Sequence, residues 1–138
     1  MTPEKEKEYL EFVKSLQQQR ACCDVGTKDM FTPDCSFLLL HSSMGMVTEA
    51  AEVMDIIKKH AVYSRPIDLN KLKDELGDLL HYLVMALINC GSSLNEIVDI
   101  NVAKLKTRYP NGYNHQSANN RDVKAETEAQ LGLGHKDI

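Results

Sequence analysis

The sequence lacks several features that mark common classes of protein. Acidic residues outnumber basic ones, and the formal net charge is −4. A general nucleic-acid binder needs a basic face to neutralise phosphates, so no nucleic-acid partner is expected. The four cysteines show no CxxC spacing and no histidine cluster beside them, which argues against a zinc site.

Long apolar runs are also missing. The longest, at 79–90, is too short for a membrane span, which needs about 20 residues. The first ten residues, MTPEKEKEYL, are rich in charge and contain no apolar core of a signal peptide. We therefore expect no membrane partner and a cytoplasmic protein whose cysteines stay reduced.

Proline and glycine are scarce, with four and seven residues, and they stand between segments of helical periodicity. Gly91 fits the end of one such segment, and Pro110 fits the end of the next. No stretch shows the alternation of polar and apolar residues that is typical of a strand. The helices expected from these patterns are about 3–19, 36–60, 69–90 and 93–109.

Four helices joined by short connections predict an all-α fold, specifically a four-helix bundle. After Pro110 the composition becomes polar, with few residues able to anchor a core. The expected organisation is therefore a helical domain at 1–110 and a polar tail at 111–138. We expect this tail to be free, or to lie across a neighbouring subunit or the entrance of a site.

Two pairs of carboxylates stand out within apolar helical segments. Glu49 and Glu52 lie three apart in TEAAEVMD, and Glu75 and Asp78 lie three apart in DELGDLLHYL. Residues at this spacing share one face of a helix, so two antiparallel helices would bring all four together. Clustered carboxylates repel one another unless a cation compensates them. Oxygen ligands without histidine or thiolate suit Mg²⁺ or Mn²⁺, so the pattern indicates metal-assisted chemistry on a polyphosphate.

Other interpretations of these residues stay open. A single pair of this kind is usually a solvated surface feature or a partner in salt bridges. His81, three residues after Asp78, also suggests a di-iron centre, but that architecture needs an ExxH motif from two helices and the sequence offers one candidate. The lysines near enough in sequence for the salt-bridge alternative are Lys58, Lys59, Lys71 and Lys73.

The last predicted helix adds positive charge. Asn101, Lys104 and Arg108 fall on one stripe of it. Lysine and arginine there could bind phosphate oxygens, the arginine with two parallel hydrogen bonds. The alternative is a basic helix end favoured by the helix dipole.

The order of these motifs resembles the MazG-like all-α nucleotide pyrophosphohydrolases. The hallmark of that family is E-E-x-x-E, a spacer and E-x-x-D; this sequence has TEAAE, a spacer at 53–74 and ELGD. The similarity covers about 36–113 and includes the segments DIIKK and NVAKLKTRYPNGY. Thr48 stands where the family has its leading glutamate, while the spacing of the carboxylates that follow is kept.

The resemblance implies Mg²⁺-dependent hydrolysis of a (deoxy)nucleoside triphosphate to the monophosphate and pyrophosphate. It implies a homodimer or homotetramer that completes the helical bundle, which agrees with the apolar breadth of the 69–90 helix. The implied roles are metal binding by Glu49, Glu52, Glu75 and Asp78, activation of water by Glu49 or Glu52, phosphate binding by Lys58 or Lys59, Lys104 and Arg108, and nucleoside binding by Tyr82 and Asn101.

Two other functions compete with this one. Phosphoribosyl-ATP pyrophosphohydrolase shares the helical carboxylate pattern and acts on a related substrate. A non-catalytic helical module for binding or oligomerisation would fit the departure at Thr48.

Overall fold

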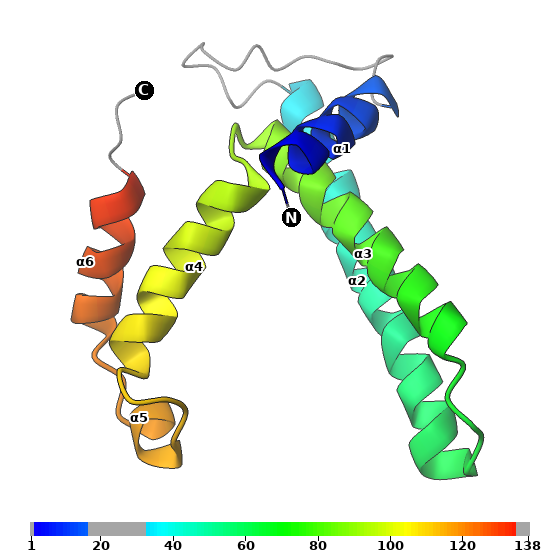
Figure 1. Cartoon of the computed structure of the whole chain (residues 1–138). Coiled ribbons are helices and arrows are strands. Elements are labelled where there is room, and N and C mark those ends of the chain that lie inside the picture. The colour runs from blue at the N-terminus through cyan, green and yellow to red at the C-terminus, as the bar shows by residue number, and fades with distance from the viewer. Residues whose placement is uncertain (1, 17–32, 135–138) are drawn as a thin grey trace. The chain divides into compact units, whose positions relative to one another are not determined.

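The computed structural model describes residues 2–16 and 33–134. Within these ranges it contains helices and no strand, which confirms the predicted all-α class (Figure 1). The six helices are α1 (Pro3–Leu16), α2 (Pro33–Tyr63), α3 (Leu69–Asn89), α4 (Leu94–Arg108), α5 (His115–Asn119) and α6 (Val123–Gly134).

The chain divides into two units, Met1–Ser92 and Ser93–Ile138. The first contains α1, α2 and α3, and the second contains α4, α5 and α6. All four helices predicted from the sequence are therefore present, but they are shared between two units. The four-helix bundle and its completion by a second copy stay predictions.

The junction between α3 and α4 lies where the sequence predicted it. Gly91 has a φ of 72°, in the left-handed region that favours glycine. Its N–H donates to the carbonyl of Ile88 at 3.2 Å, and the N–H of Ser92 donates to the carbonyl of Leu87 at 2.9 Å. These two bonds close a helix end in a Schellman motif. Ser93 then caps α4 by accepting the backbone N–H three residues further on, at 3.2 Å.

Helices α2 and α3 run antiparallel side by side, and α1 lies against α3 (Figure 1). The core of this unit is small. One cluster joins Val13 of α1 with Val84 and Met85 of α3, and Leu38, Ile56 and Leu87 are also buried. The ring of Tyr82 lies directly on Gly45 of α2, where an added Cβ would collide with it. Glycine at this position therefore allows the close approach of the two helices that carry the carboxylates.

The second unit is built from α4 and the segment after it. Within the described residues, α5 and α6 follow Pro110, and α6 packs antiparallel to α4 (Figure 1). Asp122 caps α6 by accepting the N–H of Ala125 at 3.0 Å. The predicted organisation, a helical domain at 1–110 and a polar tail at 111–138, stays a prediction.

Among the described helices, none alone is long and apolar enough to cross a membrane, and only α3 and α4 taken together meet such a criterion.

Candidate metal centre

Three carboxylates meet on the facing sides of α2 and α3. One oxygen each from Glu49, Glu75 and Asp78 lies within 4.8 Å of the other two. Glu75 and Asp78 share a face of α3 because they are three residues apart, and the antiparallel α2 brings Glu49 opposite them. Glu75 is buried, Glu49 is half-buried and Asp78 is exposed. The predicted convergence of carboxylates is thus observed for these three.

Glu52 lies outside this group of three, but its charge affects the pKa of Glu75. The pKa of Glu75 is raised above its ordinary value, first by burial of its carboxyl and next by the negative charge of Glu52. The charge of Glu49 also raises it, while Lys71 opposes both. Glu52 therefore lies close enough for its charge to be felt, although none of its oxygens belongs to the group of three.

Positive charge near the group is limited. Lys71 lies one turn before Glu75, and its Nζ is 3.7 Å from that carboxylate. Lys58 and Lys59 instead pair with Asp55, which lowers the pKa of Asp55 chiefly through the hydrogen bond from Lys59. Of the four carboxylates in the two pairs, the salt-bridge alternative thus holds for Glu75, which pairs with Lys71. Within the described residues, Lys71 alone is paired with the group, so its negative charge stays in excess.

Thr48, which the resemblance places where a leading glutamate is expected, is bonded within its own helix. Its hydroxyl lies 2.8 Å from the carbonyl oxygen of Gly45 and 3.4 Å from Oε1 of Glu49. The shorter contact is a bond back to its own helix, which occupies the one proton of the hydroxyl. Threonine here thus leaves one fewer negative charge beside Glu49 than a glutamate would.

Aromatic residues border the group. The Tyr82 ring that covers Gly45 also meets His41 and His81 edge to face, with ring centroids 5.9 and 5.3 Å apart. The nucleoside contact predicted for Tyr82 stays a prediction. The group of three ligand residues contains no histidine, so it offers no support for a di-iron centre.

Sequence reasoning missed the part played by α1. The pKa of Tyr9 is raised by burial and then by the negative charge of Asp78, so α1 brings this phenol near the group. The position of Tyr9 on the apolar face of α1 was visible in the sequence, but nothing in its spacing indicated a neighbour on α3.

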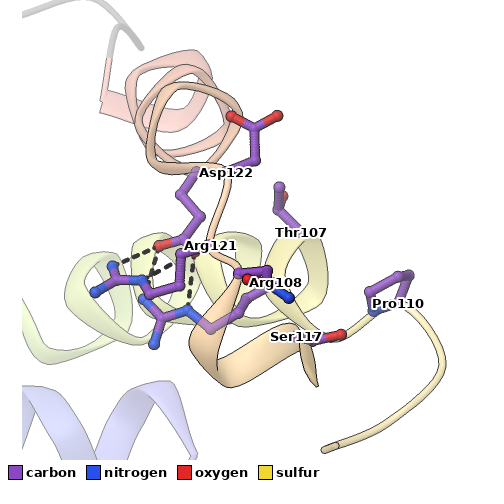
Figure 2. A pocket seen from close by; sticks show the side chains of 8 residues that line it. Thr107, Arg108, Pro110, Ser117, Arg121 and Asp122 are labelled. Carbon is purple, nitrogen blue, oxygen red and sulfur yellow. Dashed lines mark hydrogen bonds and ion pairs between the residues drawn. The ribbon is translucent and has the colours of Figure 1, made fainter. Parts of the chain in front are cut away.

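The other predicted binding residues, Asn101, Lys104 and Arg108, all belong to α4 in the second unit. Asn101 is exposed and Lys104 is half-buried. Arg108 already has a partner, because its guanidinium binds the carboxylate of Glu126 on α6 with two hydrogen bonds (Figure 2). No sequence pattern had indicated this contact between α4 and α6.

Comparison with known proteins identifies the family. Residues 41–113, a little over half of the chain, match the MazG nucleotide pyrophosphohydrolase domain. The chain belongs to this family. A search of the curated proteins and a search of the solved structures gave no match. The MazG match confirms the resemblance noted in the sequence, and it supports a hydrolase that acts on a nucleotide.

Proposed function

We propose that this MazG domain protein hydrolyses (deoxy)nucleoside triphosphates to the monophosphate and pyrophosphate with the help of a divalent cation. The observation that carries the proposal is the group formed by Glu49, Glu75 and Asp78, whose oxygens lie within 4.8 Å of one another and whose charge one lysine does not balance. An ordinary pair of carboxylates on the surface of one helix would not combine a buried carboxyl, a pKa raised by neighbouring charge and ligands from two helices.

The donor set fits Mg²⁺ or Mn²⁺. All three ligand groups are carboxylates, which these hard cations prefer, and the exposure of Asp78 leaves room for water and phosphate oxygens. When bound, such an ion supplies positive charge to the phosphates and stabilises the charge that develops as pyrophosphate leaves. Glu52, which the sequence included among the ligands, belongs to this proposal as a fourth carboxylate close to Glu75.

Activation of the attacking water falls to Glu49 or Glu52. Glu52 is exposed and lies outside the group of three, so its carboxylate is the better placed to accept a proton from water. One oxygen of Glu49 belongs to the group of three, so Glu49 is the better placed of the two to bind the metal. This division of roles predicts that Glu52→Gln impairs turnover more than it impairs metal binding.

The remaining contacts to substrate are proposed from the resemblance. Lys58 or Lys59, Lys104 and Arg108 would bind phosphates, and Tyr82 and Asn101 would contact the nucleoside. The lysines of α2 can leave Asp55 at little cost, since ion pairs between exposed side chains contribute about 0–1 kcal/mol.

The surface of α2 supports a homodimer or homotetramer that completes a four-helix bundle. Its exposed apolar residues recur at intervals of three, four or seven positions, as in the seam of a helical bundle, and they are 48–70% exposed. These residues are Phe37, Leu40, Met44, Val47 and Met54. Sedimentation showing a stable monomer at micromolar concentration would contradict this assembly.

Hydrolysis of a panel of canonical ribo- and deoxynucleoside triphosphates tests the reaction. The protein is incubated with each substrate and Mg²⁺, with and without a chelator, and the products are separated by anion-exchange chromatography. Monophosphate and pyrophosphate that disappear with the chelator are expected. Diphosphate and phosphate would contradict the proposed cleavage between the α and β phosphates. No turnover of any triphosphate would contradict the substrate class, and phosphoribosyl-ATP is then the next substrate to test before a binding module is concluded.

A further inference from the structure

Among the described residues, Lys71 is the one lysine that forms an ion pair with the group of three carboxylates. Its Nζ lies 3.7 Å from Oε1 of Glu75, which is four residues further along α3. The side chain of Glu75 is 11% exposed, whereas that of Lys71 is 51% exposed. The pair therefore joins a buried carboxylate to an ammonium group that solvent and ligands can reach.

Helix stability does not account for a lysine at this position. The N–H of Lys71 donates to the capping carboxylate of Asp68 at 3.0 Å, so Lys71 lies in the first turn of α3. The helix dipole disfavours positive charge at this end. A lysine four residues before a glutamate also stabilises a helix less than the reverse order does. The carboxylates that surround Lys71 therefore explain its position better than the helix that carries it.

The charge of Lys71 also acts on α2. Helices α2 and α3 run antiparallel, so the later residues of α2 lie beside the beginning of α3 (Figure 1). The pKa of Asp55 is lowered chiefly by the hydrogen bond from Lys59, and the charges of Lys58 and Lys71 add to this effect. Lys71 thus lies near carboxylates of both helices. All these residues belong to the first unit, so α2 and α3 alone fix their arrangement.

The charge near Glu75 is mostly negative. Its pKa is raised first by burial and then by the charges of Glu52, Glu49 and Asp74, and Lys71 alone opposes them. One ammonium group does not balance these carboxylates. A divalent cation carries twice the charge and binds oxygen ligands directly, so it would replace Lys71 as the partner of Glu75. The replacement costs little, because the half-exposed ammonium group can return to water.

We propose that Lys71 is the counter-ion of Glu75 that a divalent cation replaces, and that the released ammonium group then binds the phosphates of the substrate. Phosphate oxygens on an ion held by Glu75 would share its coordination sphere, in which ligands lie about 2.0–2.1 Å from Mg²⁺. They would therefore come within reach of Lys71, whose Nζ is 3.7 Å from the same carboxylate. Lysine has three donors on a flexible stem, so it can turn to a new partner. This inference rests on the function proposed above, which assigns no role to Lys71.

The test measures the binding of metal and of phosphate separately, each on the full chain. Mn²⁺ alone is titrated first, and electron paramagnetic resonance follows the free ion. Lys71→Gln should tighten Mn²⁺ binding about threefold, because it removes a competing charge whose effect is that of one exposed ion pair. Inorganic tripolyphosphate is then titrated calorimetrically at saturating Mn²⁺. Here Lys71→Gln should weaken binding about tenfold, because a charge-assisted hydrogen bond to phosphate is lost.

Lys73 provides a matched control on the same helix. It follows Lys71 by two residues, about 200° around the helix, and it is not paired with Glu75. Lys73→Gln makes the same change of charge and should leave both dissociation constants within about 1.5-fold of the wild type. Lys71→Arg keeps the charge, so it should bind Mn²⁺ as the wild type does and retain part of the phosphate affinity. Circular dichroism checks the helix content of every variant.

Only opposite shifts in the two constants support the role of Lys71. A variant that merely loosened α3 would bind both Mn²⁺ and tripolyphosphate more weakly, and this result would overturn the inference. Either shift without the other, no change in either constant, or equal changes in Lys73→Gln would overturn it too.

The wild type separates this inference from the proposed function. No binding of Mn²⁺ by the wild type would contradict the role of Lys71 together with the metal centre. Opposite shifts in Lys71→Gln without hydrolysis of any triphosphate would uphold the role of Lys71 and contradict only the proposed function. Hydrolysis by the wild type without opposite shifts in Lys71→Gln would contradict only the role of Lys71.

Discussion

Two buried carboxylates in this protein have opposite electrostatic surroundings. Glu75 on α3 is 8% exposed, and its pKa is raised by burial and by the charge of Glu52. Glu126 on α6 is 2% exposed, and its pKa is lowered to about 2 by hydrogen bonds from Arg108 and Arg121. Burial is similar in the two cases, but the sign of the surrounding charge differs.

This difference separates a group of carboxylates with excess negative charge from a carboxylate whose charge two arginines compensate. Around Glu75 the nearest positive group is Lys71, at 3.7 Å, while other carboxylates converge on the same volume. Around Glu126 the chain itself provides two positive charges. Burial of an acidic side chain therefore does not by itself indicate a ligand. The balance of charge around it does.

The largest expected effect comes from removing the charge at Glu75. Glu75→Gln should lower kcat/KM for triphosphates by about a thousandfold, since a metal ligand contributes several kcal/mol to transition-state stabilisation. Asp74→Asn is the matched control, because Asp74 is the preceding carboxylate on α3 and is not part of the group of three. Steady-state kinetics at saturating Mg²⁺ measures both variants. Full activity in Glu75→Gln, or an equal loss in Asp74→Asn, would show that the site is assigned to the wrong residues.

Acid should act in opposite directions on the two units. Because the folded-state pKa of Glu126 lies below its ordinary value, its contribution to stability is present above about pH 4.5 and is lost as the pH falls towards 2. The folded-state pKa of Glu75 is raised, so its protonation removes the repulsion between this carboxylate and its acidic neighbours and stabilises the folded state. This stabilisation is lost as the pH rises through the raised pKa. Hydrogen exchange of peptides, corrected for intrinsic rates, should show α4 and α6 losing protection below pH 4.5 before α2 and α3 do. In Glu126→Gln this pH dependence of α6 should flatten; its persistence would contradict the assignment.

A third test compares how the two helix pairs are held together. Gly45 lets α2 approach the ring of Tyr82, whereas the ion pair of Arg108 and Glu126 joins α4 to α6. Gly45→Ala should destabilise the first unit by about 1–3 kcal/mol, the usual cost of an overpacked contact. Gly77→Ala on α3 meets no atom within 4 Å and should stabilise it by about 0.5–1 kcal/mol. Thermal unfolding, monitored by circular dichroism, distinguishes the two variants. Similar changes in Tm for both would argue against a close contact at Gly45.

Much of this arrangement could be predicted from local sequence. Helix ends follow from nearby residues, and Gly91 marked the end of α3 correctly. The convergence of Glu49 with the α3 carboxylates followed from helical spacing and antiparallel packing. Both inferences depend on geometry within a helix or between neighbours in sequence.

What the sequence did not reveal depends on distant contacts. Arg108 and Glu126 are 18 residues apart, and spacing alone does not show that α6 folds back on α4. Polar composition after Pro110 suggested a tail, because the anchor of this segment is an ion pair rather than an apolar patch. The charge of Asp78 affects the pKa of Tyr9 because α1 packs on α3. These neighbours come from packing between helices, which the periodicity within one helix does not show.

The last test measures stabilisation by a divalent cation, and it addresses the comparison of Glu75 with Glu126 most directly. At ten times its Kd, Mg²⁺ or Mn²⁺ should add about 1.4 kcal/mol to the stability of the first unit, because it binds only the folded state. Glu75→Gln should remove most of this response while Glu126→Gln keeps it, since only Glu75 belongs to the group that would hold the ion. Differential scanning calorimetry of the three proteins with Mg²⁺, Mn²⁺ and a chelator measures the shifts in Tm. Equal responses in the two variants would mean that the cation binds elsewhere, and the contrast between the two carboxylates would then not identify the metal site.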